Sequence, residues 1–139
     1  EIDAFVHCVG TGASLRGVAT ELKRRKPSIQ FIAIEPAESA VLSGGQPGPH
    51  KIEGVGVGYT PPLWDPSLVN EILPVSTADA KAMARRLAQE EALFAGTSSG
   101  ANVVAALQVA KRLGPGAIVV TLMADSGLKY LSTDVYGIR

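Results

Sequence analysis

The sequence is poor in the residues that build disulfide frameworks and metal centres. Its 139 residues include one cysteine and two histidines. Cys8 therefore has no partner for an internal disulfide, which is typical of a protein in a reducing compartment, and a cytoplasmic location is expected. His7 and His50 lie far apart in the sequence and do not have the spacing of metal ligands, so no metal site is predicted.

Neither an excess of charge of one sign nor a long hydrophobic run is present. Thirteen lysine and arginine residues balance thirteen aspartate and glutamate residues, so the totals show no basic footprint for nucleic acid or an anionic membrane. No apolar run approaches the roughly 20 residues that a membrane-spanning helix needs. No signal peptide is visible either. We expect no nucleic-acid or membrane partner.

The composition and length that are present match one globular domain. Hydrophobic residues make up 46% and charged residues 19% of the 139 residues, which is enough to bury a single core. The sequence starts at Glu1, without methionine, directly before a strand-like segment. This start suggests a fragment or an excised domain of a longer protein.

Strand-like and helix-like segments alternate along the chain. Ser76 and Asp79 match a capping box at the start of one helix, and Pro27 ends an earlier one. The patterns predict strands at 2–9, 29–35, 70–76 and 117–127, a short strand within 92–100, and helices at 14–26, 76–91 and 99–114. Strand, glycine turn, helix and strand in this order imply parallel pairing. The predicted fold class is α/β, a three-layer α/β/α domain with a mostly parallel sheet.

Three turns that follow strands carry small and hydroxyl residues, at 10–14, 96–100 and 124–127. Ligands of parallel sheets bind beyond the carboxyl ends of the strands, so these turns are the predicted site. A glycine- and proline-rich loop at 43–66 is long for a compact domain, and such loops are usually functional.

The first turn alone leaves several interpretations open. Gly10 and Gly12 begin a dinucleotide fingerprint, and Glu35 stands where a ribose-binding carboxylate would stand, but the third glycine is replaced by Leu15. No Gly-Lys-Ser/Thr follows, which argues against a P-loop. A phosphate turn at a helix N-terminus, a nucleotide site and a tight turn without ligand all remain possible. The segment "GTSSG" at 96–100 resembles a hydrolase elbow, but both histidines precede it, which disfavours a serine hydrolase.

Four segments together narrow these interpretations. "VGTGASLRG", "EPAESAVLSGGQPGPHKIEGVGVGYTP", "GTSSGA" and "SGLKYLST" occur in that order. The chain resembles, over nearly its whole length, the C-terminal half of the cysteine synthase (O-acetylserine sulfhydrylase) family, which is close to cystathionine β-synthase. The resemblance implies a pyridoxal-phosphate-dependent enzyme of the tryptophan-synthase β-like fold, fold type II, with pyridoxal 5′-phosphate as cofactor.

The resemblance places the phosphate of the cofactor at the first turn. The family's G-T-G-G-T loop falls on Gly10, Thr11, Gly12, Ala13 and Ser14, with alanine replacing a glycine and serine replacing threonine. Serine keeps the hydroxyl donor. Alanine adds a Cβ, which disfavours a positive φ, and either a tighter loop or a shifted affinity for the cofactor is expected there.

The other segments are matched to the ring and to the substrate. The family's serine on the pyridine nitrogen corresponds to Ser98, and Asp125 stands near the ring. Cys8 replaces a small residue and is expected near the cofactor as a buried, inert thiol. The substrate pocket is expected at the glycine loop, with tyrosine replacing a commoner phenylalanine: Gly54, Val55, Gly56 and Tyr59.

The resemblance also implies that this chain is one part of an enzyme. The family's Schiff-base lysine belongs to an N-terminal domain that has no counterpart here, so residues 1–139 are the large C-terminal part, without a catalytic residue, and are predicted inactive alone. None of the lysines is expected to be buried, or to lie in a desolvated pocket next to the phosphate turn: Lys23, Lys26, Lys51, Lys81, Lys111 and Lys129.

For the whole enzyme, the resemblance implies cysteine biosynthesis from O-acetylserine and sulfide, with an amino-acid substrate, a homodimer and docking of the C-terminal tail of serine acetyltransferase. Cystathionine β-synthase or another thiol-using relative is the alternative within the family. Outside it, a nucleotide-binding module with Gly10, Gly12 and Glu35 and a non-catalytic partner-binding fragment stay open.

Overall fold

A parallel β-sheet forms the centre of the fold. The computed structural model describes residues 1–137. Its four strands are β1 (Ala4–Cys8), β2 (Gln30–Pro36), β3 (Glu71–Val75) and β4 (Val119–Thr121), in the spatial order β3-β2-β1-β4. All neighbouring pairs are parallel, with Val6 opposite both Ile32 and Thr121. The predicted parallel sheet is confirmed.

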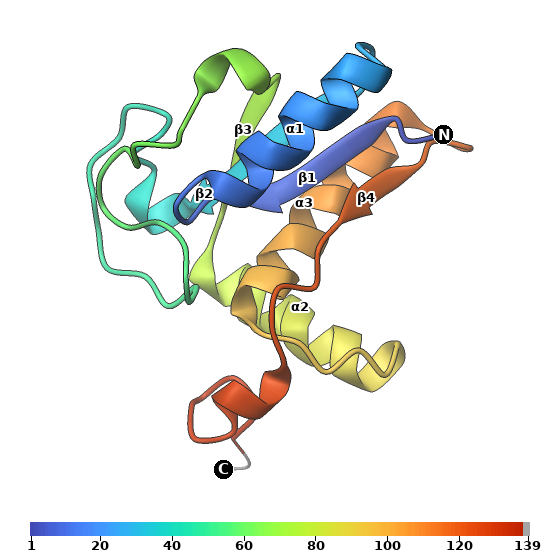
Figure 1. Cartoon of the computed structure of the whole chain (residues 1–139). Coiled ribbons are helices and arrows are strands. Elements are labelled where there is room, and N and C mark those ends of the chain that lie inside the picture. The colour runs from blue at the N-terminus through green and yellow to red at the C-terminus, as the bar shows by residue number, and fades with distance from the viewer. Residues whose placement is uncertain (138–139) are drawn as a thin grey trace.

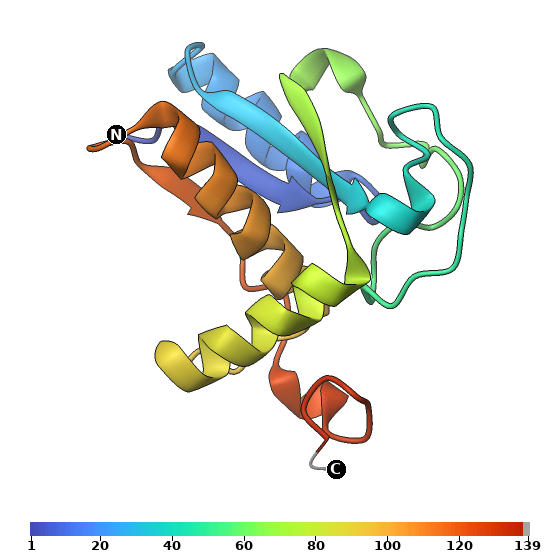
Figure 2. The same cartoon turned by 180° about the vertical axis from the view of Figure 1, so that it is seen from behind.

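Helices cover both faces of this sheet (Figure 1). Helix α1 (Ala13–Arg25) packs through Leu15 and Ala19 on Phe5 and Phe31. On the other face lies α3 (Thr97–Leu113), and α2 (Thr77–Glu90) crosses the start of α3 beyond the end of the sheet, as Figure 2 shows. The three-layer α/β/α architecture is thereby confirmed.

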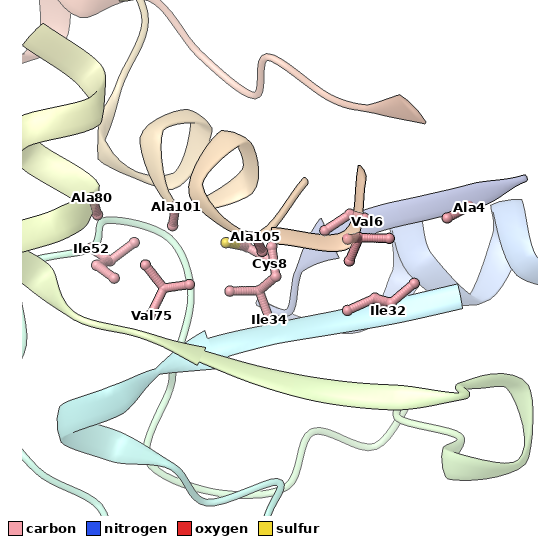
Figure 3. Packing of buried hydrophobic residues seen from close by; sticks show 11 residues of the cluster. Ala4, Val6, Cys8, Ile32, Ile34, Ile52, Val75, Ala80, Ala101 and Ala105 are labelled. Atoms are coloured by element: carbon pink, nitrogen blue, oxygen red, sulfur yellow. The ribbon is translucent and has the colours of Figure 1, made fainter. Parts of the chain in front are cut away.

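The core beneath α3 is built from small residues of the helix and branched residues of the strands. Ala101 and Ala105 of α3 meet Val6, Ile32 and Ile34 of the strands, and all five are fully buried (Figure 3). Alternation along β1 and β2 sends one set of side chains to each face. Small helical residues let the helix lie close to the sheet.

Helix α2 and helix α3 approach each other at Gly100. A Cβ built on this glycine would lie 2.0 Å from the carbonyl oxygen of Ala80 in α2. Ser76 caps α2, as predicted: its hydroxyl accepts a hydrogen bond from the Asp79 N–H at 3.0 Å and donates to the Asp79 carboxylate at 2.7 Å. These contacts position the amino-terminal end of α3.

Two predicted strands differ from the structure. The strand expected at 117–127 is only three residues long, because the chain after Thr121 bonds to α3: Leu122 O accepts from Asn102 Nδ2 and the Ala124 N–H donates to Ser99. Residues 92–95 form no strand. Ala95 makes only an isolated bridge with Ser126, and α3 begins at Thr97.

The remaining segments are short helical turns and one long loop. The 3₁₀ turns are Ala37–Ser39, Pro66–Leu68 and Gly127–Tyr130. Between Ser39 and Pro66 the chain has turns but no helix or strand. Within residues 1–137, no helix combines the length and apolar character needed to cross a membrane.

Candidate cofactor site

The carboxyl end of the sheet opens into a cavity of about 420 Å³. Helix α1 and helix α3 both start at this cavity, and the segment after β4 closes one side. The lining residues are His7, Cys8, Gly10, Thr11, Gly12, Ala13, Ser14, Leu15, Glu53, Gly54, Val55, Ser98, Ala124, Asp125 and Lys129. The structure therefore brings together all residues predicted to contact the cofactor.

The turn before α1 presents backbone N–H groups to the cavity. Gly12 is the N-cap, with φ 86°, and no side chain caps the helix. The first N–H groups of a helix have no partner within it and carry partial positive charge. Thr11 Oγ1 accepts a hydrogen bond from the Ala13 N–H at 3.3 Å, which leaves the hydroxyl proton of Thr11 free to donate. This end of α1 is built to hold an anion.

The backbone conformation does not require a tighter loop at Ala13. Ala13 is the first residue of α1, and within residues 1–137 Ala92 is the only non-glycine residue with a positive φ. Gly12 carries the left-handed conformation instead. The alanine side chain therefore fits its position without strain.

Gly10 is required by a close contact with the long loop. A Cβ on Gly10 would lie 2.4 Å from the carbonyl oxygen of Gly54. Gly54 and Val55 line the cavity, as predicted for the substrate pocket, whereas Gly56 and Tyr59 line a separate narrow hollow. Tyr59 is 61% exposed. The structure thus places only half of the predicted pocket residues at the cavity.

The three hydroxyl residues at the start of α3 differ in what their side chains contact. Thr97 Oγ1 accepts from the Glu53 N–H at 3.0 Å, and Ser99 Oγ accepts from the Ala124 N–H at 2.9 Å. Ser98 lines the cavity and is 5% exposed. Thr97 and Ser99 hold the walls, so Ser98 is the hydroxyl residue of this turn that lines the cavity.

Asp125 lines the same cavity but is engaged by its own segment. Its Oδ2 accepts hydrogen bonds from the Tyr130 hydroxyl at 2.8 Å and from Lys129 Nζ at 3.1 Å. Its Oδ1 is buried without a partner, in the space where a Cβ on Gly96 would lie. Burial, together with the bond to Asp125, raises the pKa of Tyr130 to about 12, so the phenol keeps its proton.

The floor of the cavity, at the end of β1, is uncharged. Burial raises the pKa of the Cys8 thiol to about 12 and lowers the pKa of His7. The Cys8 thiol donates to the carbonyl oxygen of Ser98 at 3.6 Å. His7 Nδ1 lies 3.4 Å from Asn102 Nδ2. Cys8 is thus buried, as the sequence predicted, and its raised pKa disfavours the reactive thiolate.

The expectation for the lysines is wrong at Lys81. Its side chain is 11% exposed, because α2 places it under the C-terminal segment, where Nζ bonds both Asp134 carboxylate oxygens at 2.7 and 2.8 Å. Lys129 also lines the cavity, which sequence reasoning missed, although it follows the third turn directly. Its side chain is 67% exposed, so it is not a desolvated amine.

Glu35 is not available to a ribose. Its carboxylate is 2% exposed and accepts hydrogen bonds from the Leu42 N–H at 2.7 Å, the Ser43 N–H at 3.2 Å and the Ser43 hydroxyl. The carboxylate therefore holds the start of the long loop. The nucleotide-binding alternative required Glu35 to bind a ribose, and this carboxylate is already engaged. Within residues 1–137, no cluster of three or more His, Cys, Asp or Glu side chains could hold a metal ion.

Comparison with known proteins agrees with this site. The profile of a family described as pyridoxal-phosphate dependent enzymes matches residues 1–125. The chain is 49% identical over 135 residues to cysteine synthase of Staphylococcus aureus, covering 97% of this chain and 44% of that one. It therefore spans less than half the length of this relative. The chain belongs to the pyridoxal-phosphate-dependent enzyme family.

Solved structures show the same fold at the same partial coverage. The O-acetylserine sulfhydrylase isoform 3 of Entamoeba histolytica superposes with a TM-score of 0.93 at 41% identity, covering 100% of this chain and 42% of that one. An O-acetylserine-dependent cystathionine β-synthase of Helicobacter pylori superposes with a TM-score of 0.92 at 40% identity, covering 97% and 44%. The α/β class predicted as fold type II is confirmed, and the family's cofactor is pyridoxal phosphate.

Proposed function

We propose that residues 1–139 form the cofactor-clamping part of an enzyme that replaces the β-substituent of an activated serine. The reaction is that of cysteine synthase, in which O-acetylserine and hydrogen sulfide give cysteine and acetic acid. The observation that carries the proposal is the meeting of two helix N-termini at one cavity, with anion donors at α1 and the Ser98 hydroxyl at α3.

The residues present fit pyridoxal 5′-phosphate. The cavity of about 420 Å³ falls in the usual range for small-molecule sites. The backbone N–H groups of Thr11, Gly12 and Ser14, with the hydroxyls of Thr11 and Ser14, form the proposed phosphate site, aided by the dipole of α1. Gly10 and Gly12 allow the turn to pack closely on its neighbours, because a Cβ on Gly10 would lie 2.4 Å from Gly54 O and a Cβ on Gly12 would lie 3.1 Å from the backbone of Leu63 and Trp64.

When bound, the cofactor supplies an electron-withdrawing ring that makes loss of the β-substituent possible. In the proposal, Ser98 Oγ donates a hydrogen bond to the ring nitrogen and retains its proton, since a hydroxyl is a far weaker acid than a carboxylic acid. Cys8 and His7 at the floor of the cavity would stay neutral, because burial disfavours their charged forms. Asp125 stays a predicted neighbour of the ring, held by Tyr130 and Lys129.

The remaining parts of the proposal concern the whole enzyme. A Schiff-base lysine from an N-terminal domain completes the site, and the enzyme is a cytoplasmic homodimer that docks the C-terminal tail of serine acetyltransferase. This chain covers 44% of the length of cysteine synthase of Staphylococcus aureus. That share supports a second part of comparable size in the whole enzyme. A cystathionine β-synthase activity is the second candidate, favoured by the 40% identity to the Helicobacter pylori enzyme.

Ligand titration tests the cofactor assignment. Pyridoxal 5′-phosphate and NAD are titrated separately into the purified protein, and we expect binding of the former alone. Binding of NAD alone would contradict the proposal. Product analysis with O-acetylserine and either sulfide or homocysteine then separates cysteine synthase from cystathionine β-synthase. Failure to form a β-replacement product with either nucleophile, in the complete protein, would overturn the proposed reaction.

A further inference from the structure

His50 is a loop residue whose two ring nitrogens both have partners. Nδ1 accepts a hydrogen bond from the Ile52 N–H at 3.2 Å, and Nε2 lies 2.9 Å from the carbonyl oxygen of Gly56. An amide N–H only donates and a carbonyl oxygen only accepts, so Nδ1 carries no proton and Nε2 carries one. The imidazole is the neutral Nε2–H tautomer, and it ties the two ends of the segment 52–56 together.

This segment is one wall of the cavity. Glu53, Gly54 and Val55 line the cavity between the two points that His50 holds. The carbonyl oxygen of Gly54 lies directly against Gly10, where no Cβ could be accommodated. A shift of the segment would therefore change the space at the start of the proposed phosphate turn.

The same wall is also held by two hydrogen bonds that do not involve His50. The Glu53 N–H donates to Thr97 Oγ1 at 3.0 Å, which links the wall to α3. The Gly56 N–H donates to the carbonyl oxygen of Val9 at 3.2 Å, which links it to the end of β1. Both bonds depend on the spacing between residues 53 and 56.

Gly56 leaves space for His50 and Pro36. Its φ is +60°, and a Cβ there would lie 2.8 Å from His50 Nε2 and 2.5 Å from Pro36 Cγ. The sequence resemblance assigned Gly56 to the substrate pocket, and that assignment stays a prediction. In the structure Gly56 lines the narrow hollow and its carbonyl oxygen meets the imidazole.

We propose that His50 is a positioning residue that holds the wall 53–55 against the turn at Gly10, so that the cofactor and substrate cavity is preformed. The consequence for ligand binding rests on the proposed function. The positioning itself concerns bonds within the chain and is testable without any ligand.

Amide exchange tests the positioning in the full-length protein. Residue-resolved exchange of the Glu53 and Gly56 amides is measured in the unsubstituted protein, in His50→Ala, in His50→Gln and in the neighbouring control Lys51→Ala. In His50→Ala we expect both amides to exchange about tenfold faster, the effect of losing one net hydrogen bond. His50→Gln keeps a donor near Gly56 and should restore part of the protection of Gly56, whereas the control should not alter either amide.

A spectroscopic measurement on the unsubstituted protein makes the test independent of variant folding. The ¹⁵N shifts of the His50 ring should show protonated Nε2 and unprotonated Nδ1. A proton on Nδ1, or unchanged exchange of Glu53 and Gly56 in His50→Ala, would overturn the proposal. A parallel titration of the unsubstituted protein with pyridoxal 5′-phosphate identifies a failure of the proposed function separately, because the exchange result stands without it.

Discussion

Asn102 and Cys8, 94 residues apart in the sequence, are joined by a hydrogen bond of 2.8 Å from the Cys8 N–H to Asn102 Oδ1. The amide nitrogen of Asn102 donates to the carbonyl oxygen of Leu122 at 2.8 Å. A fully buried side chain of α3 thus replaces β4 as the partner of β1 beyond Val6. The separation of β1 from residues 122–125 is what opens the sheet into the cavity.

Replacement of Asn102 by leucine should strongly destabilise the fold. The substitution leaves the buried Cys8 N–H without a partner and removes the part-buried hydrogen bond to the Leu122 carbonyl, at a cost of about 2–4 kcal/mol in the free energy of unfolding. Urea denaturation measures this cost. The matched control is Gln108→Leu on the exposed side of α3, which should change the free energy by less than about 0.5 kcal/mol. Equal effects of the two substitutions would contradict the bridging role of Asn102.

Alanine substitution should have opposite effects at two glycines. In Gly10→Ala, the new Cβ would lie 2.4 Å from Gly54 O, so we expect a loss of about 1–3 kcal/mol and weaker binding of pyridoxal 5′-phosphate. Gly17 lies within α1 with no neighbour within 4 Å of a Cβ. Gly17→Ala should therefore stabilise the helix by about 0.5–1 kcal/mol. Thermal unfolding and cofactor titration of both variants measure these effects, and a stable Gly10→Ala with unchanged affinity would refute the first.

Substitutions of the two adjacent serines at the start of α3 should have different effects, one on cofactor binding and the other on the free energy of unfolding. Ser98→Ala should weaken cofactor binding and leave the free energy of unfolding within about 0.5 kcal/mol. Ser99→Ala removes the acceptor for the Ala124 N–H and should cost about 1–3 kcal/mol. Equilibrium unfolding and ligand titration on both variants check the division. The assignment of Ser98 would fail if its removal left cofactor affinity unaltered.

An aspartate at position 98 tests the electronic role of the hydroxyl. A carboxylate would favour a protonated ring nitrogen and a stronger electron sink, so Ser98→Asp in the complete enzyme should shift products from β-elimination towards transamination. The ratio of pyruvate formed by elimination to aminated cofactor measures this partitioning. An unchanged ratio would count against a neutral hydroxyl as the feature that favours β-substituent loss.

Cys8 should resist thiol reagents in the native state. Burial raises its pKa to about 12, well above the ordinary value for a thiol, so almost no thiolate is present near neutral pH. Because the unfolded thiol loses its proton first, this group should lower the free energy of unfolding as pH rises from about 9 towards 12. Labelling with a disulfide reagent at pH 8 should be slow in buffer and fast in urea. Rapid native labelling would contradict a buried thiol.

Local patterns predicted the elements and the turns at the sheet edge, since each depends on a few neighbouring residues. The glycine turn at Gly10 and the capping box at Ser76 are examples. The individual site residues, Ser98 among them, came from the family resemblance. The task of Ser99 was out of reach, because it depends on Ala124, which no spacing rule connects to α3. The predicted length of β4 was wrong for the same reason. An apolar run indicates a strand, but the hydrogen bond from Asn102 to the Leu122 carbonyl ends the strand early.

Glu35 and Gly56 show the limit of motif transfer. Both occupy positions where sequence reasoning expected a ligand contact, and in the structure both have contacts within the loop. Glu35 binds Leu42 and Ser43, and Gly56 makes room for His50. A polar or glycine residue at a sheet edge is equally suited to hold a loop, and only the three-dimensional contacts distinguish the two uses.

The sheet order β3-β2-β1-β4 has a consequence for biosynthesis. Strand β1 lies inside the sheet and is synthesised before both of its neighbours, β2 and β4, so Ala4 must wait for Val119 before the second edge of β1 is paired. Pairing across such a separation is slow, and an unpaired strand edge promotes aggregation. While the chain is incomplete, the thiol of Cys8 also lacks the shelter of α3 and is open to oxidants. The emerging polypeptide is therefore most vulnerable at the residues that later become the most protected part of the cavity floor.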